Sequence, residues 1–369
     1  MIPAFARGTW LSWRPASDAV RHAPGRRLAV IPLCVLVLVA TAVPLSAQAP
    51  APAPILVLPF NNRSGDVNLD WIGESFVQAF ADAFRLAGQP VLDQSERAAA
   101  FNQEGVPNLA TLSQATLIQV AARANAGWLI LGRFTAVGGQ FSARASVFDL
   151  RRQHLVRVSA RPGPLPQLET IEARLAWRVL RVIAPDTTVS EAQVLAQRQQ
   201  VPLAAYERYI RALLATEPPV QHKFLVAAVH LDPGYSQAIY RLGLWYWRDQ
   251  DYHTALLWLP QVDARDPNYP GALFLAARCA YRLGRYGRAA ALDQRLAALW
   301  PLAQVLNNWA LAEAQLGQLH ALTLLARARR TLGADGGLQT LLAGNTAAVA
   351  CQLGDRERAL AVAQAAAPA

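Results

Sequence analysis

The feature that most constrains the fold is a repeat of 34 residues that runs from Leu231 to Pro301. The triplet Leu231-Asp232-Pro233 returns 34 residues later as Arg265-Asp266-Pro267, and another proline follows at the same spacing. A unit of this length holds two helices and a turn, and it cannot bury its apolar face alone. The sequence therefore predicts a stack of helix pairs, an α-solenoid with a concave surface.

The residues inside the repeat resemble those of the tetratricopeptide repeat, a family of 34-residue helix-turn-helix units. In the first full unit the matching positions are Ile239, Leu242, Gly243, Tyr246, Ala255, Leu259 and Pro267. Gly243 and Ala255 are small where the two helices should approach closely, and Pro267 should end the second helix. The next unit keeps Gly284, Tyr286, Ala289 and Pro301, with Ala276-Ala277 in place of a Leu-Gly pair.

We expect four to five such units within residues 203–369. Tyr206–Ala212 and Lys223–Asp232 form a shortened first unit, and Leu316-Gly317 and Leu353-Gly354 mark later ones. The resemblance implies a surface that holds other proteins, because solenoids of this kind mostly do so.

Composition indicates a globular chain whose basic residues are almost all arginine. Of 369 residues, 53% are hydrophobic and 16% are charged, which excludes the disordered class. The net charge is +10, and the basic residues are 34 arginines and the single Lys223. This excess fits nucleic-acid or membrane binding, since guanidinium suits phosphate, or a general bias toward arginine. No run of five like charges occurs, which favours the bias, and we expect no nucleic-acid partner.

Residues 1–47 have the pattern of an export segment. Arg26-Arg27 precedes an apolar stretch, 28–47, which Pro32 and Pro44 interrupt, and small residues then permit cleavage after Ala47 or Ala49. The same stretch is long enough to stay as a membrane anchor. We therefore expect a periplasmic or secreted protein, or one anchored in the inner membrane and facing the periplasm. Contact with a membrane is expected only through this segment, if it is not cleaved.

Residues 54–184 predict a mixed α/β domain in the order βαβααβββα. Its first half begins with a continuous apolar run at 55–59, typical of a buried strand. Asp70 should cap the next helix, which carries Trp71, Phe76, Phe80 and Phe84 at helical spacing, and Gly88 should end it. A short strand at 91–92, a helix from Ser95 and a helix over 113–126 follow.

The second half of this domain is predicted to be mostly strand. Apolar runs at 128–134 and 141–147 flank Gly138-Gly139, which predicts a hairpin. A last strand over 155–159 leads to a helix over 165–183. Residues 185–202 are polar and predict a linker to the repeats. The fold class is thus α+β, a mixed α/β domain followed by a helical solenoid.

The order and residues of this domain resemble the periplasmic family that includes the TolB amino-terminal domain and FlgO. The resemblance lies in Leu58-Pro59-Phe60, Ser64-Gly65-Asp66 and the strand at Gly132. The family usually has a Thr-Gly turn where Asp149 is here followed by Leu150-Arg151-Arg152. The resemblance implies interaction with envelope proteins and carries over no catalytic residue.

No pattern in the sequence supports an enzyme, a cofactor or a metal site. The loop Asn61–Asp66 lacks the spacing and the lysine of a nucleotide-binding loop. The six histidines are scattered, and no CxxC pair occurs. Cys279 and Cys351 should be buried free thiols. Arg174, Arg178 and Arg181 share one helix face, which fits either contact with lipid or an acidic partner or a plain solvated face.

The candidate site is the inner face of the solenoid, where aromatic residues alternate with arginine. These residue types dominate binding hot spots. The predicted groove residues are Gln237, Tyr240, Leu244, Trp247, Arg248, Phe274, Arg278, Tyr281, Arg282, Asn307 and Gln315. They bind an extended or helical peptide with acidic and apolar side chains, or they pack against neighbouring helices.

Together these features predict an exported, non-enzymatic adaptor that binds other envelope proteins or peptides through the groove. The alternative is a membrane-anchored sensory or transport accessory protein whose α/β domain binds a ligand or partner.

Overall fold

The computed structural model describes residues 52–105, 112–198, 200–332, 336–355, 357 and 361. The expected export segment, Cys34 and the alanine-rich end of the chain lie outside these residues. Ala53–Ala369 forms one compact unit. None of the helices in the described ranges is long and apolar enough to cross a membrane.

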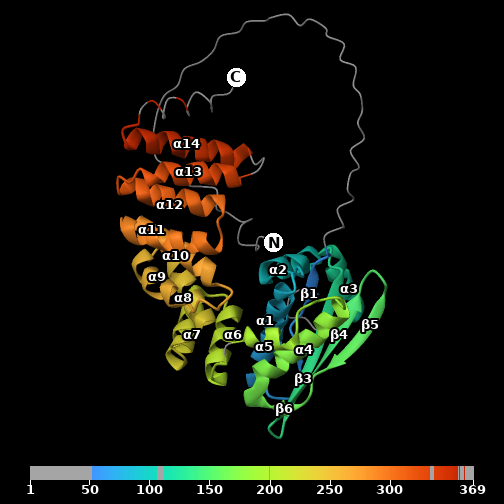
Figure 1. Ribbon diagram of the computed structural model, residues 1–369. Coiled ribbons are helices and arrows are strands. Elements are labelled where there is room, and N and C mark those ends of the chain that lie inside the picture. Colours follow the sequence, from blue (N-terminus) through green and yellow to red (C-terminus); the bar gives the residue numbers. More distant parts are fainter. Residues whose placement is uncertain are drawn as a thin grey trace, which may run out of the picture. The chain divides into compact units, whose positions relative to one another are not determined.

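The first part of the described chain is a mixed sheet with helices, shown in blue to green in Figure 1. Its strands are β1 (Ile55–Val57), β2 (Asn61–Asn62), β3 (Trp128–Val137), β4 (Gln140–Asp149), β5 (His154–Ser159) and β6 (Gly163–Pro164). Its helices are η2 (Val67–Leu69), α1 (Trp71–Leu86), α2 (Gln94–Gln103), α3 (Gln114–Arg123), η3 (Leu165–Gln167) and α4 (Leu168–Ile183). The predicted strand at 91–92 is reduced to a single parallel bridge between Val91 and Ile55.

The sheet has the order β1-β3-β4-β5, with β2 also paired to β3 and β6 to β4. β1 and β2 run parallel to β3, and β3, β4 and β5 are antiparallel. The predicted hairpin is confirmed, because Gly138 and Gly139 have φ of 59° and 75° and close the turn between β3 and β4. Glycine adopts both angles without strain, and Gly-Gly is one of the pairs that favour such a turn.

One face of the sheet carries the aromatic core that the sequence predicted. Phe76 and Phe80 of α1 pack with Phe134 of β3 and Phe141 of β4, and all four side chains are buried. Phe60 stacks on Phe76 with ring centroids 4.2 Å apart. The opposite face packs against α2 and α3 through a smaller cluster that includes Leu56, Leu129, Phe101 and Val120. Leu131 of β3 and Phe148 of β4 lie partly buried beside this cluster.

The predicted cap at Asp70 is wrong. Asp70 already has helical angles, φ −59° and ψ −29°, and its side chain makes no capping hydrogen bond. An N-cap carboxylate reaches the first free amide hydrogens only from an extended backbone. Asp70 instead accepts a hydrogen bond from Asn62 Nδ2 at 2.8 Å, while Asp66 caps η2. The predicted stop at Gly88 is confirmed by its φ of 68°.

The repeats follow in successive layers, from yellow to red in Figure 1. The segment before them contains α5 (Glu191–Ala196). The repeat helices are α6 (Leu203–Leu214), α7 (Pro218–Leu231), α8 (Ser236–Arg248), α9 (Tyr252–Trp258), η4 (Leu259–Gln261), α10 (Tyr269–Arg282), α11 (Tyr286–Leu299), α12 (Ala303–Gln315), α13 (His320–Thr331) and α14 (Gly336–Gln352). The predicted α+β fold class is confirmed.

The helix pair α8 and α9 shows why the repeat needs a glycine. A Cβ on Gly243 would lie 2.6 Å from Leu259 Cδ2, so only hydrogen fits at this approach. Leu259 is 1% exposed and Ala255 is fully buried, as predicted. The predicted end of this second helix at Pro267 is wrong, since α9 stops at Trp258. Pro260 lies two residues beyond it, lacks an amide hydrogen and restricts its predecessor, which leaves only the short η4 turn.

The two described cysteines differ in exposure. Cys279 on α10 is buried, as predicted, whereas Cys351 is exposed, so the second half of that prediction is wrong. Cys351 lies in the last turn of α14, at the end of the described repeats, where no further helix pair covers it among the described residues.

Candidate peptide-binding surface

The predicted groove residues lie on α8, α10 and α12, the first helices of three successive pairs. Arg248, Arg282 and Gln315 are exposed. A second group is half-buried and lies beside them, comprising Gln237, Leu244, Trp247, Phe274, Arg278 and Tyr281. The structure thus brings most of the predicted set onto one run of adjacent helices, with charged ends in solvent and aromatic rings partly covered.

Arg278 joins two of these helices through aromatic contacts. Its guanidinium carbon lies 5.6 Å from the centroid of the Trp247 ring on α8 and 5.6 Å from that of Phe274 on α10. Burial lowers the pKa of Arg278, and the neighbouring charge of Arg282 acts in the same direction. A guanidinium between two rings gains from cation–π attraction, so this side chain holds the surface together.

Tyr281 of α10 packs edge-on against Tyr286 of α11, with ring centroids 5.2 Å apart. Burial raises the pKa of Tyr281, and the side chain of Gln315 on α12 acts in the opposite direction. The half-buried ring of Tyr281 therefore joins the two helices of its own repeat and still reaches solvent.

Two of the predicted groove residues are buried, which corrects the prediction that they face a partner. Tyr240 is 2% exposed, and a Cβ on Gly271 of the next repeat would lie 3.1 Å from its hydroxyl oxygen. Asn307 is 8% exposed and accepts a hydrogen bond from Asn345 Nδ2 of α14 at 2.8 Å. Asn307 stands 34 residues after the buried Leu273, so it occupies a core position of the repeat. Its neighbour Asn308, half-buried, is the residue equivalent to Phe274.

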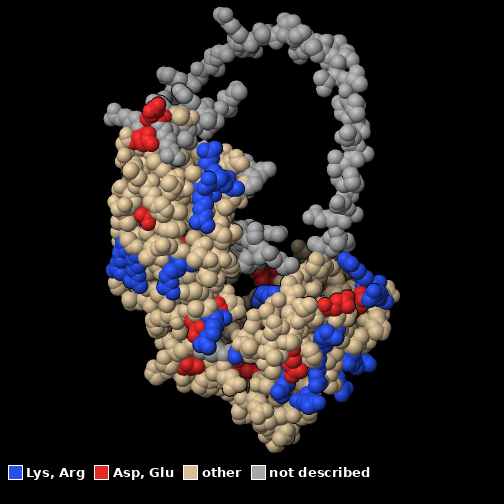
Figure 2. Space-filling view, viewed as in Figure 1, with Lys and Arg blue, Asp and Glu red and all other residues tan. Residues whose placement is uncertain are grey.

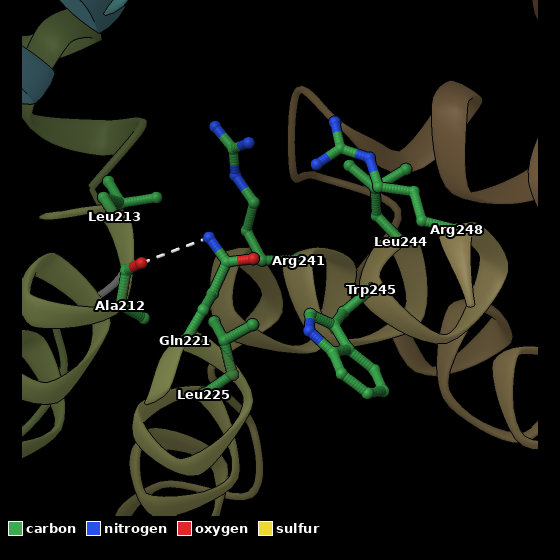
Figure 3. A pocket seen from close by; sticks show the side chains of 8 residues that line it. All are labelled: Ala212, Leu213, Gln221, Leu225, Arg241, Leu244, Trp245 and Arg248. Atoms are coloured by element: carbon green, nitrogen blue, oxygen red, sulfur yellow. Dashed lines mark hydrogen bonds between the residues drawn. The ribbon is translucent and has the colours of Figure 1, made fainter. Parts of the chain in front are cut away.

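The sequence prediction missed Arg241, which shares one face of α8 with Arg248, seven residues on. Figure 3 shows both guanidinium groups extending to the same side of α8, above Gln221, Leu225 and Trp245. These residues line a pocket of about 20 Å³ between α6, α7 and α8, which is room for about one water molecule. The spacing of Arg241 and Arg248, two helical turns apart, could have predicted from the sequence that they share one face of the helix.

A separate polar cluster lies buried between α1, α4 and α6. Tyr206 Oη donates a hydrogen bond to Glu172 Oε2 at 2.8 Å, and Ser75 Oγ donates to Glu172 Oε1. Glu172, Ser75 and Tyr206 are each 0% exposed, so solvent does not reach the carboxylate. No catalytic step follows from such a closed site, but it ties the helices beside the sheet to the first helix of the repeats.

The segment predicted as a linker supplies the cation of this cluster. Arg198, just after α5, places guanidinium nitrogens 3.6 Å from Asp82 Oδ2 and 3.6 Å from Glu172 Oε2. Burial raises the pKa of Glu172 to about 7 and that of Glu169 to about 8, while Arg198 opposes both shifts. The guanidinium of Arg198 thus has three acidic side chains near it, those of Asp82, Glu169 and Glu172. Burial keeps some of these carboxyl groups protonated near neutral pH.

No group of three or more His, Cys, Asp or Glu that could hold a metal ion occurs within the described ranges. His222, one of the scattered histidines, lies 2.9 Å from the hydroxyl of Tyr246 and packs on Trp245. It therefore serves the packing of α7 on α8.

One family model matches a segment within the repeats. The family model described as anaphase-promoting complex, cyclosome, subunit 3 matches residues 221–293. A search of curated proteins finds no match. The repeats are of the tetratricopeptide type, as the spacing and the close approach at Gly243 also indicate. The resemblance of residues 54–184 to the TolB amino-terminal family stays a prediction.

Three solved structures show partial similarity. One is YrrB, described as a TPR protein with an unusual peptide-binding site, at 18% identity over 44% of this chain and 84% of that chain, TM-score 0.40. MamA from Desulfovibrio magneticus is 15% identical in a match that covers 44% of this chain and 90% of MamA, with a TM-score of 0.37. PilW, described as a widely conserved type IV pilus biogenesis factor, is 17% identical in a match that covers 54% of this chain and 86% of PilW, with a TM-score of 0.34.

Proposed function

We propose that this chain is a non-enzymatic adaptor that binds a protein or peptide through α8, α10 and α12. The observation that carries the proposal is the pairing of exposed Arg248 and Arg282 with the half-buried rings of Trp247 and Tyr281 on adjacent helices. Rings that are already partly covered lose little conformational freedom on binding, and arginine adds directed hydrogen bonds. A surface of this kind binds a partner without a deep cavity.

The chemistry of the surface defines the partner. The charged residues of the predicted groove, Arg248, Arg278 and Arg282, are all basic, and Arg241 lines a pocket with Arg248. We infer a segment that carries acidic residues for the guanidinium groups and apolar residues for Trp247 and Tyr281. The export pattern of residues 1–47 supports a partner in the cell envelope.

The experiment reverses two exposed charges and leaves the packed ones in place. The variant Arg248→Glu with Arg282→Glu keeps Arg278, whose contacts with Trp247 and Phe274 hold the helices. The matched control is Arg329→Glu with Arg330→Glu, which changes the same charge at exposed positions of α13. Both proteins are titrated against a panel of labelled peptides rich in acidic and apolar residues, with fluorescence anisotropy as the readout.

We expect the groove variant to lose at least about tenfold in affinity for the peptides that bind the wild type, about 1.4 kcal/mol. The control should bind as the wild type does, and circular dichroism should show equal helix content in all three. Equal binding by wild type and groove variant would contradict the proposal, as would equal loss in the control.

The alternative, a membrane-anchored accessory protein whose α/β domain binds a ligand, stays a prediction. The mass of the mature amino terminus distinguishes the two, because a start at Gln48 or Pro50 requires cleavage of the expected anchor.

A further inference from the structure

The sheet has a basic face that is separate from the repeats. The pairing of β3 with β4 places Arg133 directly opposite Arg144, and β5 pairs Arg157 with Ser146, two residues along β4. Side chains alternate along a strand, so these three arginines share the face opposite the aromatic core. Arg63, just after β2, lies beside β3 through its amide hydrogen bond to Phe134 O at 2.9 Å. All four arginines are exposed.

No ion pair with a described residue neutralises the charges on this face. None of the four arginines forms an ion pair with a residue in the described ranges, whereas Arg97 pairs with Glu74 and Arg123 with Glu104. Like charges directly opposite each other on neighbouring strands destabilise a sheet. Arg144 is nevertheless held in place, because its Nε donates a hydrogen bond to Ser159 Oγ at 3.0 Å. A fixed, uncompensated pair of this kind is complementary to an anionic partner.

Apolar side chains project at one end of the same region. Val137, at the tip of the β3–β4 hairpin, has the same strand phase as Arg133 and is 68% exposed. Val67 in η2 is 77% exposed. The loop before η2 is fixed beside the hairpin, since Ser64 Oγ accepts a hydrogen bond from the amide of Ala136 at 2.8 Å. The exposed Val137 therefore lies on the same strand face as the exposed Arg133, four residues away.

The basic surface continues around the β5 edge to α4. Arg178 of α4 donates a hydrogen bond from Nη1 to Ser159 O at 3.0 Å, which joins the helix to the end of β5. Figure 2 shows basic side chains, here all arginine, gathered over β4, β5 and α4. The helix face predicted from Arg174, Arg178 and Arg181 is therefore the flank of a larger basic area, although Arg174 is paired with Glu191.

We propose that this sheet face docks on an anionic phospholipid surface. Guanidinium groups form bidentate hydrogen bonds with phosphate oxygens, and exposed apolar residues beside a basic cluster enter the headgroup region. The exposed Val137 beside the arginines fits insertion into the headgroup region, which a partner held by charge alone would not use. This contact is independent of the peptide surface on α8, α10 and α12.

The test measures sedimentation of residues 53–369 with vesicles, since this compact unit lacks the apolar segment 28–47. Vesicles contain either phosphatidylcholine alone or equal parts phosphatidylcholine and phosphatidylglycerol. The face variant is Arg133→Ser, Arg144→Ser and Arg157→Ser. The matched control, Arg327→Ser, Arg329→Ser and Arg330→Ser, removes the same charge from exposed positions of α13. Val137→Ser is measured separately.

We expect the protein to bind the vesicles that contain phosphatidylglycerol and not those of phosphatidylcholine alone. High salt should abolish this binding because it screens the charges. Each arginine near an anionic bilayer strengthens binding about fivefold, so the face variant should bind about a hundredfold more weakly and the control far less so. Val137→Ser should weaken binding without changing its dependence on salt. Equal binding by the face variant and the control would overturn the proposal. Binding to soluble polyglutamate but not to vesicles would overturn it as well, in favour of an acidic protein partner.

Discussion

Replacement of Glu172 by Gln tests the buried cluster that joins α1, α4 and α6. Glutamine has the shape of the protonated side chain but cannot ionise. Burial raises the pKa of Glu172 from 4.5 to about 7, against the opposing effect of Arg198. A carboxyl group with a raised pKa in the folded state binds more protons there than in the unfolded chain. Its contribution to stability is therefore present at low pH and is lost as the pH rises from about 4.5 to about 7.

The magnitude follows from the size of this shift. One pKa unit corresponds to about 1.4 kcal/mol, so the shift of Glu172 corresponds to about 3 kcal/mol between about pH 4 and about pH 8. Glu169 shifts in the same direction, but its side chain is only half-buried and solvent weakens its effect. The stability of the Gln variant relative to the wild type should rise by about 3 kcal/mol across this range.

The assay is urea unfolding followed by circular dichroism at several pH values, for the wild type, Glu172→Gln and a control. Glu191→Gln removes a carboxylate that pairs with Arg174 at the surface, where an ion pair contributes less than about 1 kcal/mol. Its difference from the wild type should stay small throughout. If the difference for Glu172→Gln does not grow with pH, or if the wild type gains relative stability at high pH, Glu172 is an ordinary ionised partner of Arg198 and the reasoning is refuted.

Other predictions concern packing and thiol exposure. Gly243→Ala should destabilise the protein by about 1–3 kcal/mol in urea unfolding, because the new Cβ would lie 2.6 Å from Leu259 Cδ2; Gly287→Ala, which meets no atom within 4 Å, is the control. Cys351 should react with a thiol reagent in the native protein, whereas Cys279 should react only on unfolding, since burial raises its pKa to about 12; equal native rates would contradict this.

Local patterns predicted the elements well wherever one physical cause dominates. The aromatic residues of α1 recur at helical spacing because one side of that helix faces the sheet, and the glycine pair at 138–139 between two apolar runs favours a tight turn. Predictions failed where two local signals compete. Asp70 has the side chain of a cap, yet η2 ahead of it fixes helical angles. Pro260 stops α9 before the repeat's own Pro267 is reached.

The sequence assigned the candidate residues to the first helices of successive repeats, but it did not set the exposure of each residue. Arg248 and Arg282 are exposed because their repeat phase points them away from the core. The prediction named Asn307, which occupies the repeat position of the buried Leu273 and is itself buried against Asn345. The position equivalent to Phe274 is that of the next residue, Asn308. Tyr240 was placed in the right phase and is buried all the same, because Gly271 of the next repeat leaves room for its ring. Burial between repeats depends on side chains that lie a whole unit away.

The sequence by itself determined the repeat length, the helix pairs and the strand-rich first domain, because each follows from contacts within one unit or one hairpin. Tertiary structure alone decided which distant residues meet. It brings Ser75, Glu172 and Tyr206 into one buried network and sets Arg133 opposite Arg144. Such meetings depend on strand register and helix docking, which local periodicity does not encode.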